Sequence, residues 1–347
     1  MNYKIGRDNF ALTIFMPVDC KNGCSFCTSK KDYQINKPDF GKVFNAIDTI
    51  AHYNIPFSDI VITGGEPFAD ITALKIILEF TRLLNPDCNF YINTSLPKDT
   101  VDKAIKLINN TDCIKGVNIS RHLKKVFCDK VADIEDIKRI KKPIHFNCVL
   151  FEEPTDKELI EYCDLYSPIG QPTFRADYRT ITHDNLHSCN YPLFRRLDNL
   201  FGFESSTQCH VCHTDHFENG CVLHRGVENS HIEFKNHVEV NDIIIKQNGE
   251  IRYDWNSECV ADSKVLSSLG VESSSTSFGS TCNPDIVRPH VDLSRPAMGG
   301  CGYSGGCGGR TYNTGCGGRS DYSYSGCGGT RNYGMICGRA IYGSGGC

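Results

Sequence analysis

Six short apolar runs, separated by segments of helical character, constrain the fold of this chain more than any other feature. The runs lie at 11–18, 59–64, 89–95, 116–120, 144–151 and 172–177. Between them lie helical patterns, namely Val43, Ile47, Ile50 and Ala51 at amphipathic spacing and the segments 71–84, 98–109, 132–141 and 155–166. This alternation predicts an α/β fold with a parallel sheet covered by helices. Six such strands suit an open, partial barrel with its site at the carboxyl ends of the strands.

The alternation stops near residue 185, and two regions of different character follow. Residues 186–260 are Cys-rich and contain Asn248-Gly249 between two alternating apolar runs, which predicts a tight β-hairpin with both turn residues at positive φ. From residue 261 the chain is rich in Ser, Gly and Asn, and after Met298 it has no apolar periodicity. We therefore predict a barrel at 1–185, a Cys-rich extension at 186–260, and a linker with a disordered low-complexity tail at 261–347.

The chain has 20 cysteines among 347 residues, and the N-terminus does not resemble a signal peptide. Without an export signal, these cysteines are expected to be metal ligands, reactive thiols or substrates rather than a disulfide framework. No run of 18 apolar residues occurs, so we expect a soluble cytoplasmic protein with no membrane partner. The net charge of -4 gives no basic stripe, so no nucleic acid partner is expected. Five scattered cysteines in apolar contexts are expected to be buried as small hydrophobes: Cys88, Cys113, Cys128, Cys148 and Cys163.

Three cysteines, Cys20, Cys24 and Cys27, follow the first predicted strand within eight residues. Zinc usually takes four protein ligands, whereas an iron-sulfur cube held by three cysteines keeps one iron open for another ligand. A second motif follows the second predicted strand, where the turn 64–67 reads Gly-Gly-Glu-Pro. Its glycines allow close approach of the backbone to a ligand, and the Glu66 carboxylate suits an ammonium group.

Together, the Cys-x3-Cys-x2-Cys loop, with Phe26 before its last cysteine, and the Gly-Gly-Glu-Pro turn resemble the radical S-adenosylmethionine (SAM) superfamily over residues 10–180. The resemblance implies a partial (β/α)6 barrel and a 4Fe-4S cluster whose open iron binds SAM. Reductive cleavage of SAM would give a 5′-deoxyadenosyl radical that abstracts hydrogen from a substrate. The resemblance also implies an electron donor such as flavodoxin or ferredoxin. No catalytic side chain is assigned, because the radical arises at the cluster.

The same resemblance implies a set of residues that bind the cofactor. Glu66 would hold the amino group of SAM, beside Phe26, Gly64, Gly65 and Pro67. Polar residues on later strands are further candidates for SAM, namely Asn93, Ser95, Ser120, Arg121 and Asn147. Arg175, Asp177 and Arg179, after the sixth strand, are candidates for facing the substrate.

The middle cysteines Cys189, Cys209, Cys212 and Cys221 have the number of ligands that a closed zinc site or an auxiliary iron-sulfur cluster requires. Peptide-modifying radical SAM enzymes carry auxiliary clusters in this part of the chain, although the spacing here departs from theirs. His210, His213 and His216 lie among these cysteines, and Cys259 is either an exchange ligand or a free thiol. Reduced thiols in a loop remain the alternative.

The tail has cysteines at 301, 307, 316, 327, 337 and 347, each except the last followed by glycine. It resembles the core of a ribosomally made, modified peptide (RiPP) that a radical SAM maturase would modify, for example by thioether formation. Enzyme and substrate would then be fused, with 261–297 as the tether. The alternatives are a disordered extension, metal or redox binding, and an artefact of the sequence boundary.

The sequence thus predicts a radical SAM enzyme that acts on a peptide or protein, with its own tail as one candidate substrate. A second hypothesis is a radical SAM enzyme for a small molecule or nucleoside, with an incidental tail. A third, from another class, is a non-catalytic protein that binds zinc or another metal.

Overall fold

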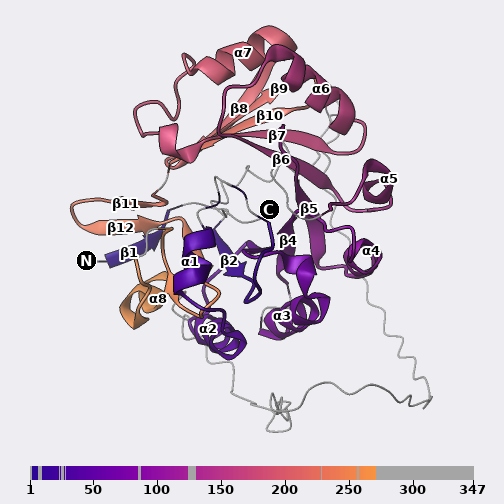
Figure 1. Ribbon diagram of the computed structural model, residues 1–347. Helices are drawn as coiled ribbons and strands as arrows, with labels where there is room; N and C mark the ends of the chain where they lie inside the picture. Colours follow the sequence, from indigo (N-terminus) through magenta and orange to yellow (C-terminus); the bar gives the residue numbers. More distant parts are fainter. Residues whose placement is uncertain are drawn as a thin grey trace, which may run out of the picture. The chain divides into compact units, whose positions relative to one another are not determined.

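The computed structural model describes residues 2–6, 10–22, 24, 27, 29–84, 87–123, 130–227, 229–255 and 258–270 (Figure 1). The predictions made for Phe26, for Cys128 and for the Cys/Gly-rich tail lie outside these residues. Within them, no helix has the length and apolar character that crossing a membrane requires.

An 11-stranded sheet organises the described residues. Its parallel strands are, in spatial order, β13 (Asp242–Ile245), β2 (Ala11–Phe15), β3 (Asp59–Thr63), β4 (Asn89–Thr94), β5 (Ile114–Ser120), β6 (Ile144–Leu150), β7 (Gln171–Ala176) and β10 (Val222–Gly226). Antiparallel strands complete both edges, with β14 (Ile251–Arg252) beside β13, and β9 (Cys212–Phe217) and β8 (Phe203–Cys209) beyond β10. The six apolar runs are β2 to β7, so the predicted α/β fold and parallel strand order are confirmed.

Helices connect these strands, as the periodicity predicts. They are α2 (Phe40–His52), α3 (Ile71–Leu84), α4 (Val101–Asn110), α5 (Ile134–Ile137) and α6 (Asp156–Tyr166), while α1 (Ser29–Ile35) follows the cysteine loop. Figure 1 shows α2 to α6 on one side of the row of strands. Side-chain caps start several of them, and in α6 Thr155 and Glu158 form a reciprocal capping box. The helix predicted at 132–141 is only one turn long, over Ile134–Ile137.

The two faces of the sheet differ in polarity because side chains alternate along each strand. In β6, Phe146 and Cys148 are fully buried in the apolar core with the helices, whereas His145 and Asn147 lie on the opposite face and line a pocket. The other central strands follow the same alternation. The sheet therefore has an apolar face under the helices and a polar face that lines a pocket.

The Cys-rich extension contributes α7 (Pro192–Phe201) and strands at both edges of the large sheet. It also forms a 3-stranded sheet in which β12 (His237–Val240) pairs with β1 (Asn2–Ile5) in parallel and with β11 (His231–Glu233) antiparallel. The last described helix, α8 (Ser263–Leu269), packs against β1. Two single-turn 3-10 helices, η1 (Pro67–Ala69) and η2 (Tyr178–Thr180), follow β3 and β7.

The predicted hairpin at Asn248-Gly249 forms between β13 and β14, but its turn differs from the prediction. Only Gly249 has a positive φ, at 79°, whereas Asn248 is not among the described residues with a positive φ. The Lys246 N–H donates to Glu250 O at 2.9 Å, so the loop is longer than a two-residue primed turn. The prediction that both turn residues take positive φ was therefore wrong.

Candidate functional site

The cysteine loop begins directly beyond the carboxyl end of β2. Cys24 is buried, and Cys20 and Cys27 are partly exposed. Burial is the main cause that raises the pKa of Cys20 to about 11, and the charges of Glu66 and Cys27 also raise it. Hydrogen bonds from Asn22 lower this pKa and so oppose the rise. The Glu66 carboxylate and the Cys27 thiol therefore lie near Cys20, and a cation would be needed to hold this sulfur as a thiolate.

The redox state of the three cysteines differs. Cys20 and Cys27 are free thiols, whereas Cys24 takes part in a disulfide bond. All three sulfurs can ligate a cluster only after that disulfide is reduced. The donor set therefore fits an iron-sulfur cluster in the reduced protein.

The Gly-Gly-Glu-Pro turn needs both of its glycines. Gly64 and Gly65 have φ of +70° and +42°, in the left-handed region that favours glycine. A Cβ on Gly65 would lie 2.0 Å from Val18 O, and one on Gly64 would lie 2.3 Å from Phe15 Cδ1. The turn thus packs directly against the segment that leads into the cysteine loop, and no side chain fits at either glycine.

The Glu66 carboxylate is buried and accepts hydrogen bonds from its own chain. Oε1 accepts from Phe68 N at 3.1 Å and from the Thr94 hydroxyl, and Oε2 accepts from Ser95 N at 2.8 Å and Ser95 Oγ at 2.6 Å. Burial raises the pKa of Glu66, and the hydrogen bonds from Ser95, Thr94 and Phe68 oppose that rise. Four bonds occupy the usual acceptor capacity of a carboxylate. An ammonium ligand would fit here if the hydroxyl of Thr94 or Ser95 rotated away.

A hydrogen-bonded link joins the cysteine loop to this carboxylate. Asn22 Nδ2 donates to Ser95 Oγ at 3.3 Å, and Ser95 Oγ donates to Glu66 Oε2. Behind the link, Arg121 is 6% exposed and donates to the carbonyls of Ser95, Ser120 and Ala132 at 2.7 to 2.8 Å. Arg121 therefore holds the carboxyl ends of β4 and β5 in place, and its guanidinium group donates to backbone carbonyls.

Leu96, next to Ser95, also marks this turn as constrained. It is fully buried, and its φ of 54° lies in the left-handed region that a branched side chain seldom adopts. Its N–H donates to Thr94 Oγ1 at 2.7 Å, which holds the hydroxyl that contacts Glu66. Sequence reasoning missed Thr94, although its place at the end of a strand next to Ser95 was a usable signal.

Further along the polar face, amide side chains form a ladder across neighbouring strands. Asn118 Nδ2 donates to Asn93 Oδ1 at 2.7 Å, and Asn93 Nδ2 donates to Thr63 Oγ1 at 3.3 Å. Ser120 pairs in register with Asn147 on the adjacent strand. The predicted residues Asn93, Ser120 and Asn147 thus share one face of the sheet with Asn118, which sequence reasoning missed.

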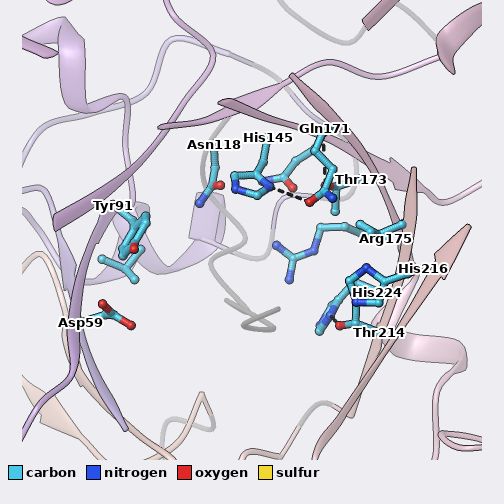
Figure 2. Close-up of a pocket in the computed structure, with 13 residues that line it drawn as sticks. Asp59, Tyr91, Asn118, His145, Gln171, Thr173, Arg175, Thr214, His216 and His224 are labelled. Carbon is cyan, nitrogen blue, oxygen red and sulfur yellow. Dashed lines mark hydrogen bonds between the residues drawn. The ribbon is translucent and has the colours of Figure 1, made fainter. Parts of the chain in front are cut away.

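A pocket on this polar face enclosing about 770 Å³ of space, including its open mouth, is shown in Figure 2. The pocket runs from Asp59 and Gln171, the first residues of β3 and β7, to Arg175 near the carboxyl end of β7. The Glu66 site lies at the carboxyl ends of β3 and β4. Figure 2 shows Asp59 and Tyr91 on one side of the pocket and Arg175, His216 and His224 on the other. Opposite charges therefore face each other across it.

Three histidines add hydrogen-bonding groups to the pocket. His145 Nδ1 lies 3.0 Å from Gln171 Oε1, and His224 Nδ1 lies 2.9 Å from Thr214 Oγ1. Burial lowers the pKa of His145 and of His216, so both rings are neutral at pH 7. The pocket can thus bind a ligand that offers both donors and acceptors.

The three residues after the sixth strand that were predicted to face the substrate do not lie together. Arg175 lines the pocket, whereas Asp177 and Arg179 form an ion pair at the 3-10 helix η2, with Arg179 Nε 2.8 Å from Asp177 Oδ1. Asp177 also caps η2 through Arg179 N. Of these three, only Arg175 is placed to meet a ligand in the pocket.

The structure does not bring the four middle cysteines together. Cys209 and Cys212 pair in register at the turn of the β8–β9 hairpin, and Cys189 is exposed in the loop before α7. Cys221 precedes Val222, which pairs with His216, whereas Cys212 pairs with Gly226. Four residues of strand, roughly 13 Å, separate these two pairs.

The fully buried Cys221 contacts α6 instead of the other middle cysteines. A hydrogen bond with Cys163 raises the pKa of Cys221 and lowers the pKa of Cys163. Cys163 was expected to be a buried hydrophobe, and its burial is confirmed, as is that of Cys88 and Cys148. Cys113 is only half-buried. A site made of all four middle cysteines would require Cys221 to leave this contact.

The histidines among the middle cysteines have separate surroundings. His213 is buried, with Nδ1 3.0 Å from His187 Nδ1 and Nε2 2.8 Å from Asp215 Oδ1. Asp215 in turn accepts from the buried Arg225 at 2.8 Å. His210 is exposed, and His216 lines the pocket described above. Only His216 of these three therefore joins the polar face.

No family model and no curated protein matches this chain. Among 25 matching chains of solved structures is Streptococcus suis SuiB bound to its precursor peptide SuiA, with a TM-score of 0.46 and 14% identity. The match covers 75% of this chain and 61% of SuiB, less than two thirds of that protein. A TM-score below 0.5 does not establish a shared fold, and we draw nothing from it.

Proposed function

We propose that this chain is a radical SAM enzyme with a partial-barrel fold. The observation that carries the proposal is the hydrogen-bonded link between the cysteine loop and the Gly-Gly-Glu-Pro turn. Asn22 of the cysteine loop bonds to Ser95, which bonds to Glu66, and Gly65 packs against the Val18 carbonyl. Two motifs about forty residues apart thus meet at the carboxyl ends of neighbouring parallel strands, where α/β proteins bind their ligands.

In this proposal, Cys20, Cys24 and Cys27 hold a 4Fe-4S cluster once the Cys24 disulfide is reduced. Glu66 receives the amino group of SAM, beside the backbone of Gly64, Gly65 and Pro67. Asn93, Ser95, Ser120 and Asn147, with Phe26, are the proposed further contacts. With both groups bound, the site would supply a 5′-deoxyadenosyl radical that removes hydrogen from a substrate.

We propose a peptide or protein as the substrate, with the Cys/Gly-rich tail as the first candidate. The polar pocket supports this choice, because peptide groups offer both hydrogen-bond donors and acceptors, and Asp59 and Arg175 suit charged side chains. Fusion to the enzyme would raise the effective concentration of the tail at the site. An electron donor such as flavodoxin or ferredoxin, in the cytoplasm, would reduce the cluster. Cys209 and Cys212 remain proposed ligands of an auxiliary metal, with Cys189.

Anaerobic reconstitution of the full chain with iron and sulfide under reducing conditions tests the class of reaction. We expect about four irons bound through the N-terminal loop and formation of 5′-deoxyadenosine from SAM on reduction. Cys24→Ala should abolish both, whereas Cys148→Ala, at another buried cysteine away from the loop, should retain them. Bound zinc with no cleavage of SAM would instead support the non-catalytic hypothesis.

Intact-mass measurement after turnover tests the substrate separately. Modification of the tail by thioether formation predicts a loss of two hydrogens per cross-link, which should be absent in Cys24→Ala. Cleavage of SAM with an unchanged tail would reject self-modification, keep the radical SAM assignment and favour a separate substrate.

A further inference from the structure

We propose that His231, Asp254 and Cys259 form a zinc site, separate from both predicted cysteine clusters. One ligand atom from each residue lies within 4.8 Å of the other two. His231 Nδ1 is 2.8 Å from Asp254 Oδ2 and 4.0 Å from Cys259 Sγ. No other group of His, Cys, Asp and Glu among the described residues meets this condition.

The donor set matches the coordination chemistry of zinc. Imidazole nitrogen, carboxylate oxygen and thiolate sulfur are its three usual protein donors, and three protein ligands leave a fourth position for water. Asp254 is fully buried and Cys259 is 7% exposed, so the ion would be shielded from solvent. On binding, Zn²⁺ would take the place of the proton between His231 Nδ1 and Asp254, which passes to Nε2 or to solvent, and of the Cys259 thiol proton, which passes to solvent, with no change in oxidation state.

The surrounding groups already hold these donors in place. Asp254 Oδ2 accepts from Ser230 N at 2.6 Å and from His231 N at 2.8 Å, which fixes the carboxylate. On the other side of the imidazole, His231 Nε2 lies 3.9 Å from Glu233 Oε1. Zinc-bound histidines usually direct their second nitrogen at such a carboxylate.

A plain His–Asp ion pair beside a buried cysteine is the competing interpretation. It accounts for the 2.8 Å contact, and a hydrogen bond with Tyr253 gives the Cys259 thiol a partner, but neither explains why an imidazole, a carboxylate and a thiol converge within 4.8 Å. The position of the cluster would let one ion join separate parts of the fold. His231 begins β11 in the 3-stranded sheet, Asp254 follows β14 of the large sheet, and Cys259 precedes α8. One zinc ion would tie together three segments and both sheets.

The test compares zinc bound by the full chain and by variants, because the other free thiols of the chain are also able to bind zinc. Chelator-treated, reduced protein is loaded with Zn²⁺, freed of excess and analysed for metal. Cys259→Ser and His231→Gln should each bind one zinc fewer than wild type, and their affinity at this site should fall about 100-fold or more. Cys113→Ser, at a cysteine outside every proposed site, should bind as much as wild type.

Cobalt(II) provides a second readout that a merely structural role would not change. Wild type should show sulfur-to-cobalt charge-transfer absorption. The difference between its spectrum and that of Cys259→Ser reports this site. His231→Gln should lose the same absorption component. Circular dichroism checks that both variants fold, and if Cys259→Ser does not, His231→Gln decides. Equal zinc and an equal cobalt spectrum in wild type and in the folded variants would overturn the proposal.

Discussion

Two parts of the polar face differ in the hydrogen-bond partners of their side chains. At the carboxyl ends of the strands, Glu66, Thr94 and Ser95 bond to one another, and Arg121 bonds to backbone carbonyls. Along the rest of this face, Asp59, Arg175 and three histidines line an open pocket. The same strand alternation produces both parts of the face. The constrained turns at Gly65 and Leu96 bring polar groups together at the carboxyl ends.

Gly65→Ala should have the largest effect, because it disrupts the constrained turn at the carboxyl ends of the strands. A Cβ there would lie 2.0 Å from Val18 O in a left-handed backbone conformation, so the turn and the cysteine loop must shift. We expect a loss of about 2 kcal/mol or more in the free energy of unfolding and no cleavage of SAM. Denaturant unfolding and 5′-deoxyadenosine formation measure the two effects.

Gly41→Ala is the matched control for this substitution. Gly41 lies in α2, where a Cβ would meet only Asp39 Oδ1 at an ordinary 3.5 Å. This change should be neutral or should stabilise the helix by up to about 1 kcal/mol. Equal stability of the two variants would show that the close contact at Gly65 does not constrain the turn.

Glu66→Gln tests whether the carboxylate, rather than the turn, binds the cofactor. The amide loses the charge and places a donor against the donors Phe68 N or Ser95 N, so we expect a loss of about 1 to 3 kcal/mol in stability. If Glu66 binds the amino group of SAM, affinity for SAM should fall by more than tenfold while iron content stays unchanged. Equilibrium binding of SAM to the reconstituted variant is the measurement, and unaltered affinity would remove Glu66 from the proposed site.

Arg175→Ala tests the open pocket on this face. Loss of a charged hydrogen-bonding group from the pocket should lower kcat/KM for the substrate by roughly tenfold to a hundredfold and leave SAM binding intact. Arg179→Ala, which breaks an exposed ion pair next to the pocket, should have no such effect. Equal losses in the two variants would mean that the pocket is not the substrate site.

The pH dependence of stability gives the smallest expected effect. Burial raises the pKa of Glu66 above its ordinary value of 4.5, so the folded protein holds this proton more tightly than the unfolded chain does. The stabilising contribution of the protonated carboxyl is then complete below pH 4.5 and is lost as the pH rises through the folded pKa. Relative to Glu66→Gln, wild type should lose stability over this range. Parallel stability curves for the two proteins would contradict the raised pKa.

Local patterns in the sequence were sufficient for the framework of the fold. The six strands and the bounds of α3 follow from side-chain periodicity, which depends on neighbours along the chain. The position of Glu66 at the end of β3 followed from the same pattern. The sequence did not reveal that Thr94 and Ser95 surround its carboxylate, because strand pairing decides which residues of β4 lie beside β3.

The middle cysteines show where sequence spacing fails. Cys209 and Cys212 lie side by side because a tight turn joins them, and their role as metal ligands stays a prediction. Cys221 is close in sequence but lies at the far end of a strand and contacts Cys163 of α6. His231, Asp254 and Cys259 show the reverse, because three separate segments bring them together without a spacing motif.

The pairing of β2 with β13 also sets an order for folding during synthesis. Ala11 pairs with Asp242 and Ile14 with Ile245, so one edge of β2 stays unpaired until nearly all of the described chain has been made. Such distant contacts are slow to form, and the open edge is exposed to other chains in the meantime. The residues that complete the sheet nevertheless precede the Cys/Gly-rich tail in the sequence. The ribosome would therefore release the strands of the candidate site before it releases the segment proposed as their substrate.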